Sequence, residues 1–335
     1  MDKKSQKILE IIAAFPGKKI IVWGDIILDE YLYGTTRRVS REAPVLVLSY
    51  KDKEYALGGA GNSLFNLRSM GANPIPVGVI GRDSAGDRVI QILKANNIST
   101  KYLIQINNFQ TPTKSRILAG EETARKQQIL RIDYEGKVPE DNSVQKRLLK
   151  NLIKLRNETQ ALLISDYNYF IVKEDIYKKI LPGFRKAKIP VTLDSRFRIL
   201  NFKGVTVSTP NESEVEDAFK IEFNSDEELI KKTGRHLLNL TEAEAILITR
   251  GSKGMVLFER RKTPWAIPIH GTTDIVDVTG AGDTVISVFT LALACGSGHR
   301  DAAALANHAG GLVVMKKGTA VITIEELKNS IQSEN

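Results

Sequence analysis

The stretch KIIVWGD, residues 19–25, contains an apolar run that ends in Gly24 and Asp25. A short apolar run of this kind predicts a buried strand of a parallel sheet that enters a loop at its carboxyl end. Similar units, separated by segments of helical spacing, recur at residues 75–81, 161–166, 190–194, 205–210 and 245–251. Strands that alternate with helices predict a doubly wound, mostly parallel α/β sheet with helices on both faces.

Two segments interrupt this alternation. Residues 31–57 and 108–133 lack helical periodicity and contain β-like pieces such as 45–48 and 114–118. We expect them to form a small antiparallel sheet that projects from the main sheet and acts as a lid over a cleft. No linker or repeat sets off a second domain, so we expect residues 1–335 to form a single domain that carries these two lid segments.

The bulk composition excludes several functional classes. The chain has 335 residues, of which 42% are hydrophobic, and a formal net charge of +9. Its basic residues are scattered, so we expect no nucleic-acid partner. No apolar run reaches the roughly 20 residues that cross a bilayer, and no signal peptide begins the chain, so we expect a cytoplasmic protein without a membrane partner. The single cysteine, Cys295, allows no disulfide within the chain.

Polar residues follow several of the predicted strands: Asp25, Asp166, Asp194, Asn211 and Thr249-Arg250. In open α/β sheets, ligands bind outside the carboxyl ends of the strands. We therefore expect these side chains to line one cleft. The alternative is that each caps the helix that follows its strand.

The stretch DVTGAGDTVI, residues 277–286, places three small residues before Asp283 and an apolar, helix-like run after it. Small residues at a helix N-terminus allow close approach of an anion to free N–H groups. A carboxylate beside an anion site is unfavourable for binding alone. It is reasonable if the carboxylate removes a proton from a nucleophile that attacks the anion.

Three further motifs have both a functional and a structural interpretation. Residues 58–62, GGAGN, begin a helix and predict either a ligand contact or a tight turn. Asn211 and Glu214 fit either a capping box or a hydrated Mg²⁺ site. Residues 249–254, TRGSKG, fit either a nucleotide-phosphate contact or a glycine-rich hairpin. These stretches match neither the dinucleotide-binding motif G-x-G-x-x-G nor the P-loop motif G-x-x-x-x-G-K-[ST].

Together the motifs resemble those of the ribokinase-like, or phosphofructokinase B, carbohydrate kinases. The matching stretches are residues 58–62, 211–214, 249–251 and 277–284, and they occur in the family's order along nearly the whole chain. The resemblance implies a ribokinase-like doubly wound sheet with a small projecting β-sheet lid. It also implies a sugar as phosphoryl acceptor, ATP as co-substrate and Mg²⁺ as cofactor.

The resemblance also implies roles for individual residues. Asp283 is the expected catalytic base, and the N–H groups of Gly280, Ala281 and Gly282 are expected to stabilise the transferred phosphoryl group. The expected substrate contacts are Asp25, Asp29, Arg38, Gly58, Gly59, Asn62, Arg116, Asp166 and Arg196. The expected nucleotide contacts are Asn211, Thr249, Arg250, Gly251, Gly254 and Asn307. The expected metal sites are Glu214 for Mg²⁺ through water, and Asp277 with Thr279 for a monovalent cation such as K⁺.

A narrower similarity connects residues 24–31, 38–45 and 127–133 with the heptose-7-phosphate kinases, which serve ADP-heptose synthesis for lipopolysaccharide. In many bacteria that kinase is fused to a nucleotidyltransferase, whose H-x-G-H motif is absent here, so we expect the stand-alone kinase. The sequence departs from the family at 168–170, where a Lys-Gly pair is usual, and at 194–196, where Asp-Pro-Lys is usual.

The expected substrate is D-glycero-β-D-manno-heptose 7-phosphate, phosphorylated at its anomeric hydroxyl. Arginine and lysine suit a phosphate, and they gather in the segments expected at the sugar end: Arg37, Arg38, Arg41, Lys114, Arg116, Arg196 and Arg198. A kinase for another sugar, sugar phosphate or nucleoside is the alternative. A non-catalytic sugar-binding protein would be expected to lose Asp283. We expect a homodimer joined through the lid sheets, because a small sheet needs its apolar face covered.

Overall fold

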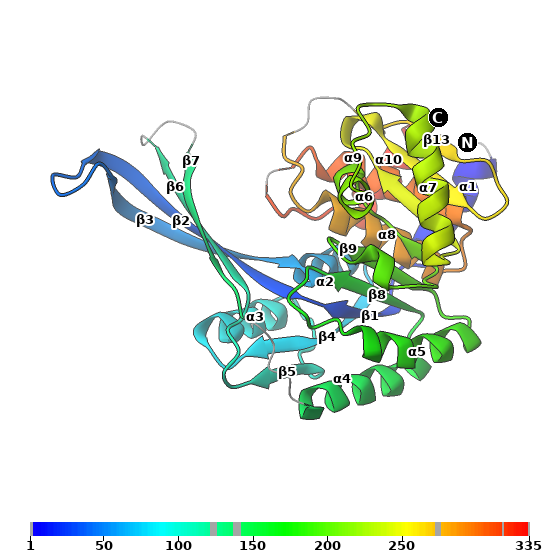
Figure 1. Ribbon diagram of the computed structural model, residues 1–335, viewed down its shortest axis with the longest axis horizontal. Coiled ribbons are helices and arrows are strands. Elements are labelled where there is room, and N and C mark those ends of the chain that lie inside the picture. The colour runs from blue at the N-terminus through cyan, green and yellow to red at the C-terminus, as the bar shows by residue number, and fades with distance from the viewer. Residues whose placement is uncertain (1–2, 121–125, 137–141, 272–275, 317, 334–335) are drawn as a thin grey trace.

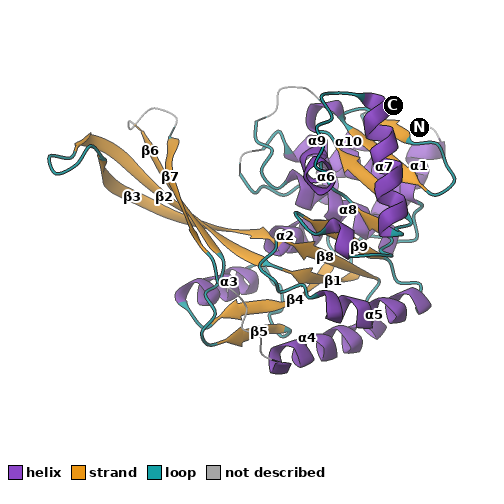
Figure 2. Cartoon of the chain, viewed as in Figure 1, coloured by secondary structure: helices purple, strands orange, loops and turns teal. Residues whose placement is uncertain are grey.

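The computed structural model describes residues 3–120, 126–136, 142–271, 276–316 and 318–333 (Figures 1 and 2). Its main sheet has nine strands in the order β13-β12-β11-β10-β9-β8-β1-β4-β5. From β11 to β5 the neighbours are parallel, whereas β12 pairs antiparallel with both β11 and β13. The strands are β1 (Lys19–Gly24), β4 (Asn73–Gly81), β5 (Leu103–Ile106), β8 (Ala161–Asp166), β9 (Val191–Ser195), β10 (Val207–Ser208), β11 (Ala245–Thr249), β12 (Met255–Glu259) and β13 (Trp265–Ile267).

Helices cover both faces of this sheet. One face carries α1 (Lys3–Ala13), α2 (Ala60–Ser69), α3 (Ser84–Ala95), α8 (Ala281–Ala294), α9 (His299–Val313) and α10 (Ile324–Gln332). The other carries α4 (Asn142–Leu155), α5 (Glu174–Lys186), α6 (Glu212–Phe219) and α7 (Glu227–Thr241). Short 3-10 turns are η1 (Arg156–Glu158), η2 (Ile199–Asn201) and η3 (Gly251–Lys253).

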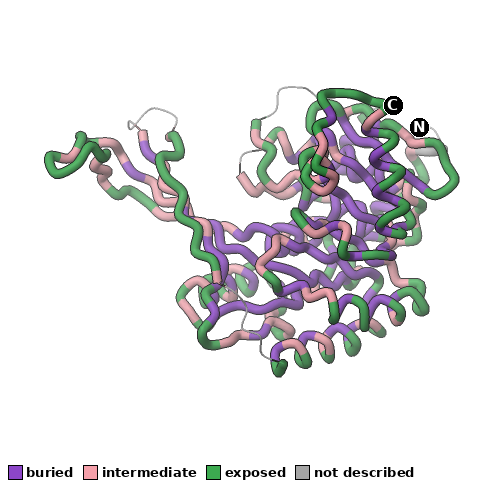
Figure 3. Tube along the Cα trace, viewed as in Figure 1, coloured by how far each residue is buried: buried purple, intermediate pink, exposed green. Residues whose placement is uncertain are grey.

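Strand β1 shows how the sequence builds the two cores. Successive side chains of a strand point to opposite faces of the sheet. Ile20 and Val22 therefore pack into the core beneath α2 and α8, whereas Ile21 and Trp23 pack into the core beneath α4 and α5. Figure 3 shows the resulting buried interior on both sides of the strands. The expected doubly wound, mostly parallel sheet is confirmed.

A second sheet projects from the main body (Figure 1). It has four strands in the order β3-β2-β6-β7: β2 (Ile26–Val39), β3 (Leu46–Gly59), β6 (Thr113–Gly120) and β7 (Gln127–Tyr134). The expected antiparallel arrangement is wrong in one respect, because β2 and β6 are parallel. Both strands follow a strand of the parallel main sheet, β1 or β5, and leave it in the same direction. We call this four-stranded element the projecting sheet.

Within the residues that the structure describes, no helix has the length and apolar character needed to span a membrane.

Candidate functional site

Asp283 lies in the first turn of α8 and is only 4% exposed. Its Oδ2 accepts a hydrogen bond from Nδ2 of Asn62 at 2.8 Å, and its Oδ1 accepts one from the hydroxyl of Tyr167 at 3.3 Å. Burial raises the pKa of Asp283 to about 6, against the lowering effect of these hydrogen bonds. A carboxylate with such a pKa is ionised at neutral pH and is a better proton acceptor than an exposed aspartate.

The glycines before Asp283 shape the approach to it. Gly280 caps α8 with a φ of 78°, and a Cβ at this position would come within 2.4 Å of Nδ2 of Asn62. The hydrogen bond between Asn62 and Asp283 therefore depends on the absence of a side chain here. Gly280 and Gly282 line the pocket in front of Asp283. The N–H of Ala281 instead donates to the carbonyl of Val278 at 3.2 Å, which removes it from the expected set of anion donors.

The pocket in front of Asp283 is acidic, and we call it the acidic pocket. Asp194 and Glu214 lie in it with Asp283, together with Arg196 and Tyr167. Burial raises the pKa of Glu214 to about 7, and burial followed by the charges of Glu214 and Asp283 raises the pKa of Asp194 well above its usual range. Each ionised carboxylate therefore disfavours ionisation of the others.

Glu214 also belongs to a capping box. The side chain of Asn211 accepts from the N–H of Glu214 at 2.8 Å, and Oε2 of Glu214 accepts from the N–H of Asn211 at 2.9 Å. The capping interpretation of this motif is therefore correct. It does not remove the carboxyl group from the pocket, because the box fixes Glu214 at the start of α6, beside the acidic pocket.

A hydrated divalent cation fits the acidic pocket better than a directly ligated one. Within the described ranges, no group of three or more His, Cys, Asp or Glu side chains has the arrangement of a metal site. Yet a cation among Asp194, Glu214 and Asp283 would offset the repulsion that raises their pKa values. Mg²⁺ keeps several waters and requires few protein ligands, which matches carboxylates gathered around a pocket.

A second, largely apolar pocket adjoins the first. Asn211, Thr249 and Gly282 line both pockets. The expected nucleotide contacts Gly251, Gly254 and Asn307 line the second one, with apolar walls from Met255, Ile269, Val278, Val285 and Val314. We call it the apolar pocket. A flat aromatic base suits such walls, with polar groups at one end.

Arg250 does not belong to the apolar pocket. Its guanidinium donates to Oε1 of Glu212 at 2.7 Å and to both carboxylate oxygens of Glu227 at 2.7 and 3.0 Å. These two ion pairs link η3 to the starts of α6 and α7 and turn the arginine side chain away from the expected nucleotide. Its neighbours Thr249 and Gly251 do line the pocket.

A third pocket is cationic and lies between the projecting sheet and the loop after β8. Lys114 and Arg196 line it, together with Tyr169 and Phe170. Arg131 also lines it but is paired with Asp133, and Glu135 adds a second carboxylate to its wall. Burial lowers the pKa of Lys114, Asp29 opposes this effect, and the charges of Arg196 and Arg131 lower the pKa further. We call this the cationic pocket. Tyr167 and Arg196 line both it and the acidic pocket, so the two pockets adjoin.

Several residues expected to contact a sugar bind protein groups instead. Arg116 forms an ion pair with Asp29, and its guanidinium lies over the ring of Tyr31. Gly58 packs against the carboxylate of Asp29. Arg38 is exposed near the far end of β2, which Figure 1 shows projecting away from the main sheet.

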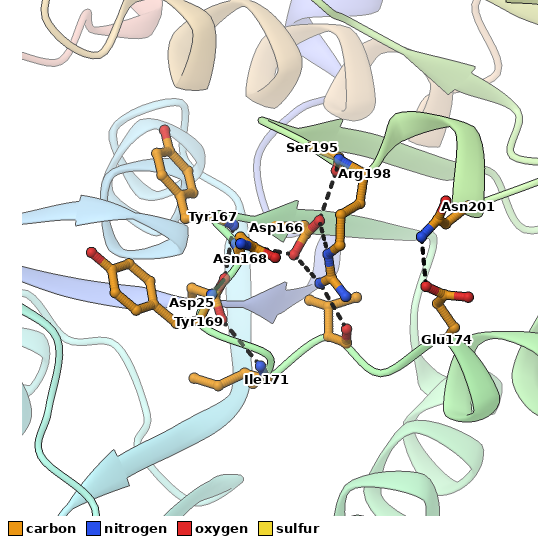
Figure 4. A network of polar contacts seen from close by, with 11 residues as sticks. Asp25, Asp166, Tyr167, Asn168, Tyr169, Ile171, Glu174, Ser195, Arg198 and Asn201 are labelled. Atoms are coloured by element: carbon orange, nitrogen blue, oxygen red, sulfur yellow. Dashed lines mark hydrogen bonds and ion pairs between the residues drawn. The ribbon is translucent and has the colours of Figure 1, made fainter. Parts of the chain in front are cut away.

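Asp25 and Asp166 are fully buried and lie side by side at the carboxyl ends of β1 and β8 (Figure 4). Asp25 accepts from three backbone N–H groups of the loop after β8. Asp166 pairs with Arg198 and accepts from the Ser195 hydroxyl at 2.7 Å. Arg198 is therefore not a free cation for a phosphate, and direct contact of either aspartate with a substrate stays a prediction.

Gly59 is the N-cap of α2, with a φ of 58°. A Cβ here would come within 2.6 Å of the Asp25 carbonyl oxygen and 3.3 Å of the ring of Tyr167. The glycine thus allows Tyr167 to reach Asp283.

Asp277 and Thr279, the residues expected at a monovalent-cation site, take part in hydrogen bonds that connect two loops. Oδ1 of Asp277 accepts from the N–H of Thr279 at 2.9 Å, and its Oδ2 accepts from the N–H of Gly318 at 3.0 Å. Their arrangement joins the segment before α8 to the segment after α9. A bound K⁺ stays a prediction.

Tyr167 is the main site residue that sequence reasoning did not assign. It was visible only as part of a strand-end motif, and nothing in its spacing predicts contact with a residue more than a hundred positions later. Asp194 was expected in the cleft as a strand-end residue, but no role was assigned to it. Met255, Ile269 and Val314 of the apolar pocket lie outside every motif, because scattered apolar residues normally predict core.

Comparison with known proteins identifies the chemistry that this site resembles. The family model described as pfkB family carbohydrate kinase matches residues 18–326. The chain is 38% identical over 324 residues to the bifunctional protein HldE of Haemophilus influenzae strain PittEE, and 36% identical to that of Mesorhizobium japonicum. Each alignment covers 96% of this chain but only 65% and 63% of the relative.

Solved structures share the fold at lower identity. A ribokinase from Arabidopsis thaliana complexed with ribose and ATP has a TM-score of 0.70 and 21% identity, and the match covers 95% of this chain and 98% of that one. Phosphofructokinase-2 from Escherichia coli in complex with fructose-6-phosphate has a TM-score of 0.73 and 14% identity, with 95% and 99% covered.

Proposed function

The chain belongs to the pfkB family of carbohydrate kinases, and from this premise we propose that it is an ATP-dependent kinase for a sugar that already carries a phosphate. The proposed reaction phosphorylates the anomeric hydroxyl of D-glycero-β-D-manno-heptose 7-phosphate to give the 1,7-bisphosphate. Two observations favour the heptose. Residues 24–31, 38–45 and 127–133 are similar to heptose-7-phosphate kinases, and 96% of this chain aligns with part of the HldE proteins.

The cationic pocket carries the proposal of a phosphorylated substrate. Lys114 and Arg196 line a space that adjoins the acidic pocket. Burial is the main cause of the lowered pKa of Lys114, and the charge of Arg196 lowers it further. An anion would stabilise both cations at this position. A sugar phosphate would place its phosphate here and its reacting hydroxyl near Asp283, whereas a neutral sugar would leave both cations without this partner.

The residues around Asp283 then have distinct tasks. Asp283 accepts the proton of the attacking hydroxyl, while Asn62 and Tyr167 hold its carboxylate in place. The N-terminus of α8, reached through Gly280 and Gly282, faces the charge on the transferred phosphoryl group. The apolar pocket holds the nucleoside of ATP. Transfer thus depends on positioning and charge stabilisation.

Mg²⁺ fits this arrangement at the acidic pocket, where Asp194 and Glu214 would hold it through water. When bound, it would neutralise phosphate charge. Glu214 and Asp194 line the acidic pocket together with Arg196, whose positive charge lowers the pKa of both carboxyl groups. In this proposal the cationic pocket binds the phosphate of the sugar, and the acidic pocket holds Mg²⁺ near the reacting hydroxyl.

The first prediction concerns the base. We expect Asp283→Asn to bind ATP normally but to lower kcat by at least ~10²-fold, the low end of general-base contributions. Asp87→Asn, an exposed first-turn aspartate of α3, is the matched control and should retain wild-type turnover. Coupled ADP assays measure kcat, and nucleotide titrations measure ATP binding, for both variants. Turnover of Asp283→Asn within a few fold of wild type would remove Asp283 from the mechanism.

The pH profile provides a second test. The base must be ionised, so kcat/KM should rise with pH through about 6, the raised pKa of Asp283, and level off above it. The Tyr167 hydroxyl lowers this pKa by its hydrogen bond. Tyr167→Phe should therefore move the midpoint upward by roughly half to one pH unit. The exposed Tyr50→Phe should not move it, and an unmoved or lower midpoint in Tyr167→Phe would contradict this assignment.

The third prediction tests the cationic pocket. Wild-type kcat/KM should be much higher for heptose 7-phosphate than for unphosphorylated heptose. Lys114→Met should lower the value for the phosphorylated sugar by roughly 10- to 100-fold, because a charged contact is lost, with little effect on the neutral sugar. Lys150→Met, an exposed lysine of α4, is the control.

Two outcomes of this comparison would overturn parts of the proposal. Better kcat/KM on any neutral sugar, such as ribose or fructose, would refute phosphate recognition by the cationic pocket. A preference for fructose 6-phosphate over heptose 7-phosphate would keep phosphate recognition and refute the heptose.

We also propose a homodimer formed through the projecting sheets. In the β6–β7 pair, Lys114 lies opposite Asp133 and Arg116 opposite Arg131, so one face is charged. The next positions place Ile117 opposite Leu130 and Ser115 opposite Ile132 on the other face. Leu130 and Ile132 are 51% and 40% exposed. A second copy of the same sheet would cover this apolar face.

Light scattering tests the dimer. The wild-type protein should be a dimer at micromolar concentration, and Leu130→Lys with Ile132→Lys should be a monomer. Ile153→Lys, an exposed isoleucine on α4, should leave the mass unchanged. A monomeric wild-type protein would contradict the proposal.

A further inference from the structure

The loop after β8 is built around the carboxylate of Asp25. Oδ2 of Asp25 accepts from the N–H groups of Tyr167 at 2.7 Å and Tyr169 at 3.1 Å, and Oδ1 accepts from the N–H of Ile171 at 3.3 Å (Figure 4). The three donors are alternate residues of the loop. The residues between them, Asn168 and Phe170, have φ values of 66° and 63°.

This alternation has a physical consequence. When every second residue adopts the left-handed conformation, successive alternate N–H groups turn toward the same side and form a concave anion site, or nest. In residues 167–171 the anion is supplied by the protein itself. The site is closed to solvent, because Asp25 is 0% exposed.

The left-handed residues show that the nest needs its anion. Asparagine tolerates a positive φ, but phenylalanine adopts it only where the surroundings impose it. Three N–H groups directed at one carboxylate provide such an imposed geometry. The N–H bonds also lower the pKa of Asp25, against burial and the charge of Asp166, which together raise it to about 7.

The two ends of the loop are fixed by a second carboxylate. Asp166 accepts from the N–H of Asn168 at 3.3 Å and pairs with Arg198 (Figure 4). Arg198 also donates to the carbonyl oxygen of Val172 at 3.0 Å. Between these points Asp25 accepts from the three alternate N–H groups, and the guanidinium of Arg198 also lies over the ring of Phe170.

This loop serves both pockets that the proposed substrate would occupy. Tyr167 lines both of them and directs its hydroxyl to Asp283, at 3.3 Å. Tyr169 and Phe170 line the cationic pocket. A change in the loop would thus alter the catalytic base and the phosphate end together, without touching the apolar pocket.

We propose that Asp25 is a positioning residue: its carboxylate fills the backbone nest of residues 167–171 and thereby places Tyr167 against Asp283 and Tyr169 in the cationic pocket. It acts on the sugar only through this loop, in place of the direct hydroxyl contact expected from the sequence. The link to the sugar rests on the proposed kinase function, whereas the nest itself rests on the backbone geometry.

Amide hydrogen exchange followed by NMR tests the nest without reference to activity. In the wild-type protein the amides of Tyr167, Tyr169 and Ile171 should exchange at least tenfold more slowly than the amide of Phe170. In Asp25→Ala, and to a smaller extent in Asp25→Asn, this protection should fall at all three positions. Asp29→Asn removes another buried carboxylate of the same cleft that does not contact this loop, and it should leave the protection unchanged.

Kinetics of the same variants test the link to the substrate. Asp25→Asn should raise KM for the sugar phosphate and lower kcat, with KM for ATP unchanged, because only the two tyrosine-lined pockets depend on the loop.

Wild-type amides that exchange as fast as that of Phe170 would overturn the nest even if the variants fail to fold. A raised sugar KM with unchanged amide protection would make Asp25 a direct sugar ligand and overturn the positioning role. Failure of the wild-type enzyme to phosphorylate heptose 7-phosphate, with the amide pattern intact, would refute the proposed function alone.

Discussion

The burial of several carboxylates at one edge of the main sheet is the constraint on which the site depends. A buried carboxylate is unfavourable unless hydrogen bonds or an opposite charge compensate it. Asp25 is compensated by three backbone N–H groups, Asp166 by Arg198 and Asp29 by Arg116. Each of these partners belongs to a different loop or strand, so compensation of the charges also fixes the shape of the cleft.

The remaining carboxylates are compensated less completely, and they are the ones that face the open pocket. Asp283 has two hydrogen bonds and still a raised pKa, mainly because it is buried. Burial also raises the pKa of Asp194 and Glu214, and the charge of Asp283 adds to both effects. In the cationic pocket, burial lowers the pKa of Lys114 and the charge of Arg196 lowers it further. Charged side chains that the protein compensates incompletely are expected at a binding site, because ligands supply what the protein lacks. The free energy of folding alone would not favour gathering like charges in either the acidic or the cationic pocket.

The sequence predicted the main sheet well because its strands have strong local signals. Apolar runs such as Ile20 to Trp23 are short, bounded by turn residues and separated by helical periods, so local pattern and tertiary fold agree. The projecting sheet was predicted less well, because the direction of pairing between β2 and β6 depends on where each strand leaves the main sheet and not on its own residues. The capping box at Asn211 was predicted as one of two alternatives, and the structure shows that the cap and a pocket position coexist.

Individual site residues were harder to predict, for a physical reason. Arg116, Arg198 and Arg250 look like ligand-binding cations in the sequence, yet each is paired with a carboxylate that is distant in sequence or on another element. Spacing cannot show which of two opposite charges will meet. The ring of Tyr167 packs beside Gly59 and its hydroxyl reaches Asp283, so three separate segments of the chain meet at this point. Pair contacts of this kind are set by the fold and are invisible to a motif.

The central claim is that a sugar phosphate spans the two charged pockets with its anomeric hydroxyl at Asp283. Phosphorus NMR of the product formed from ATP, Mg²⁺ and D-glycero-β-D-manno-heptose 7-phosphate tests this most directly. We expect one new phosphorus signal coupled to the anomeric proton, formed in equal amount to ADP, with the 7-phosphate signal retained. No ADP above the sugar-free control, or a new phosphate on any other carbon, would contradict it.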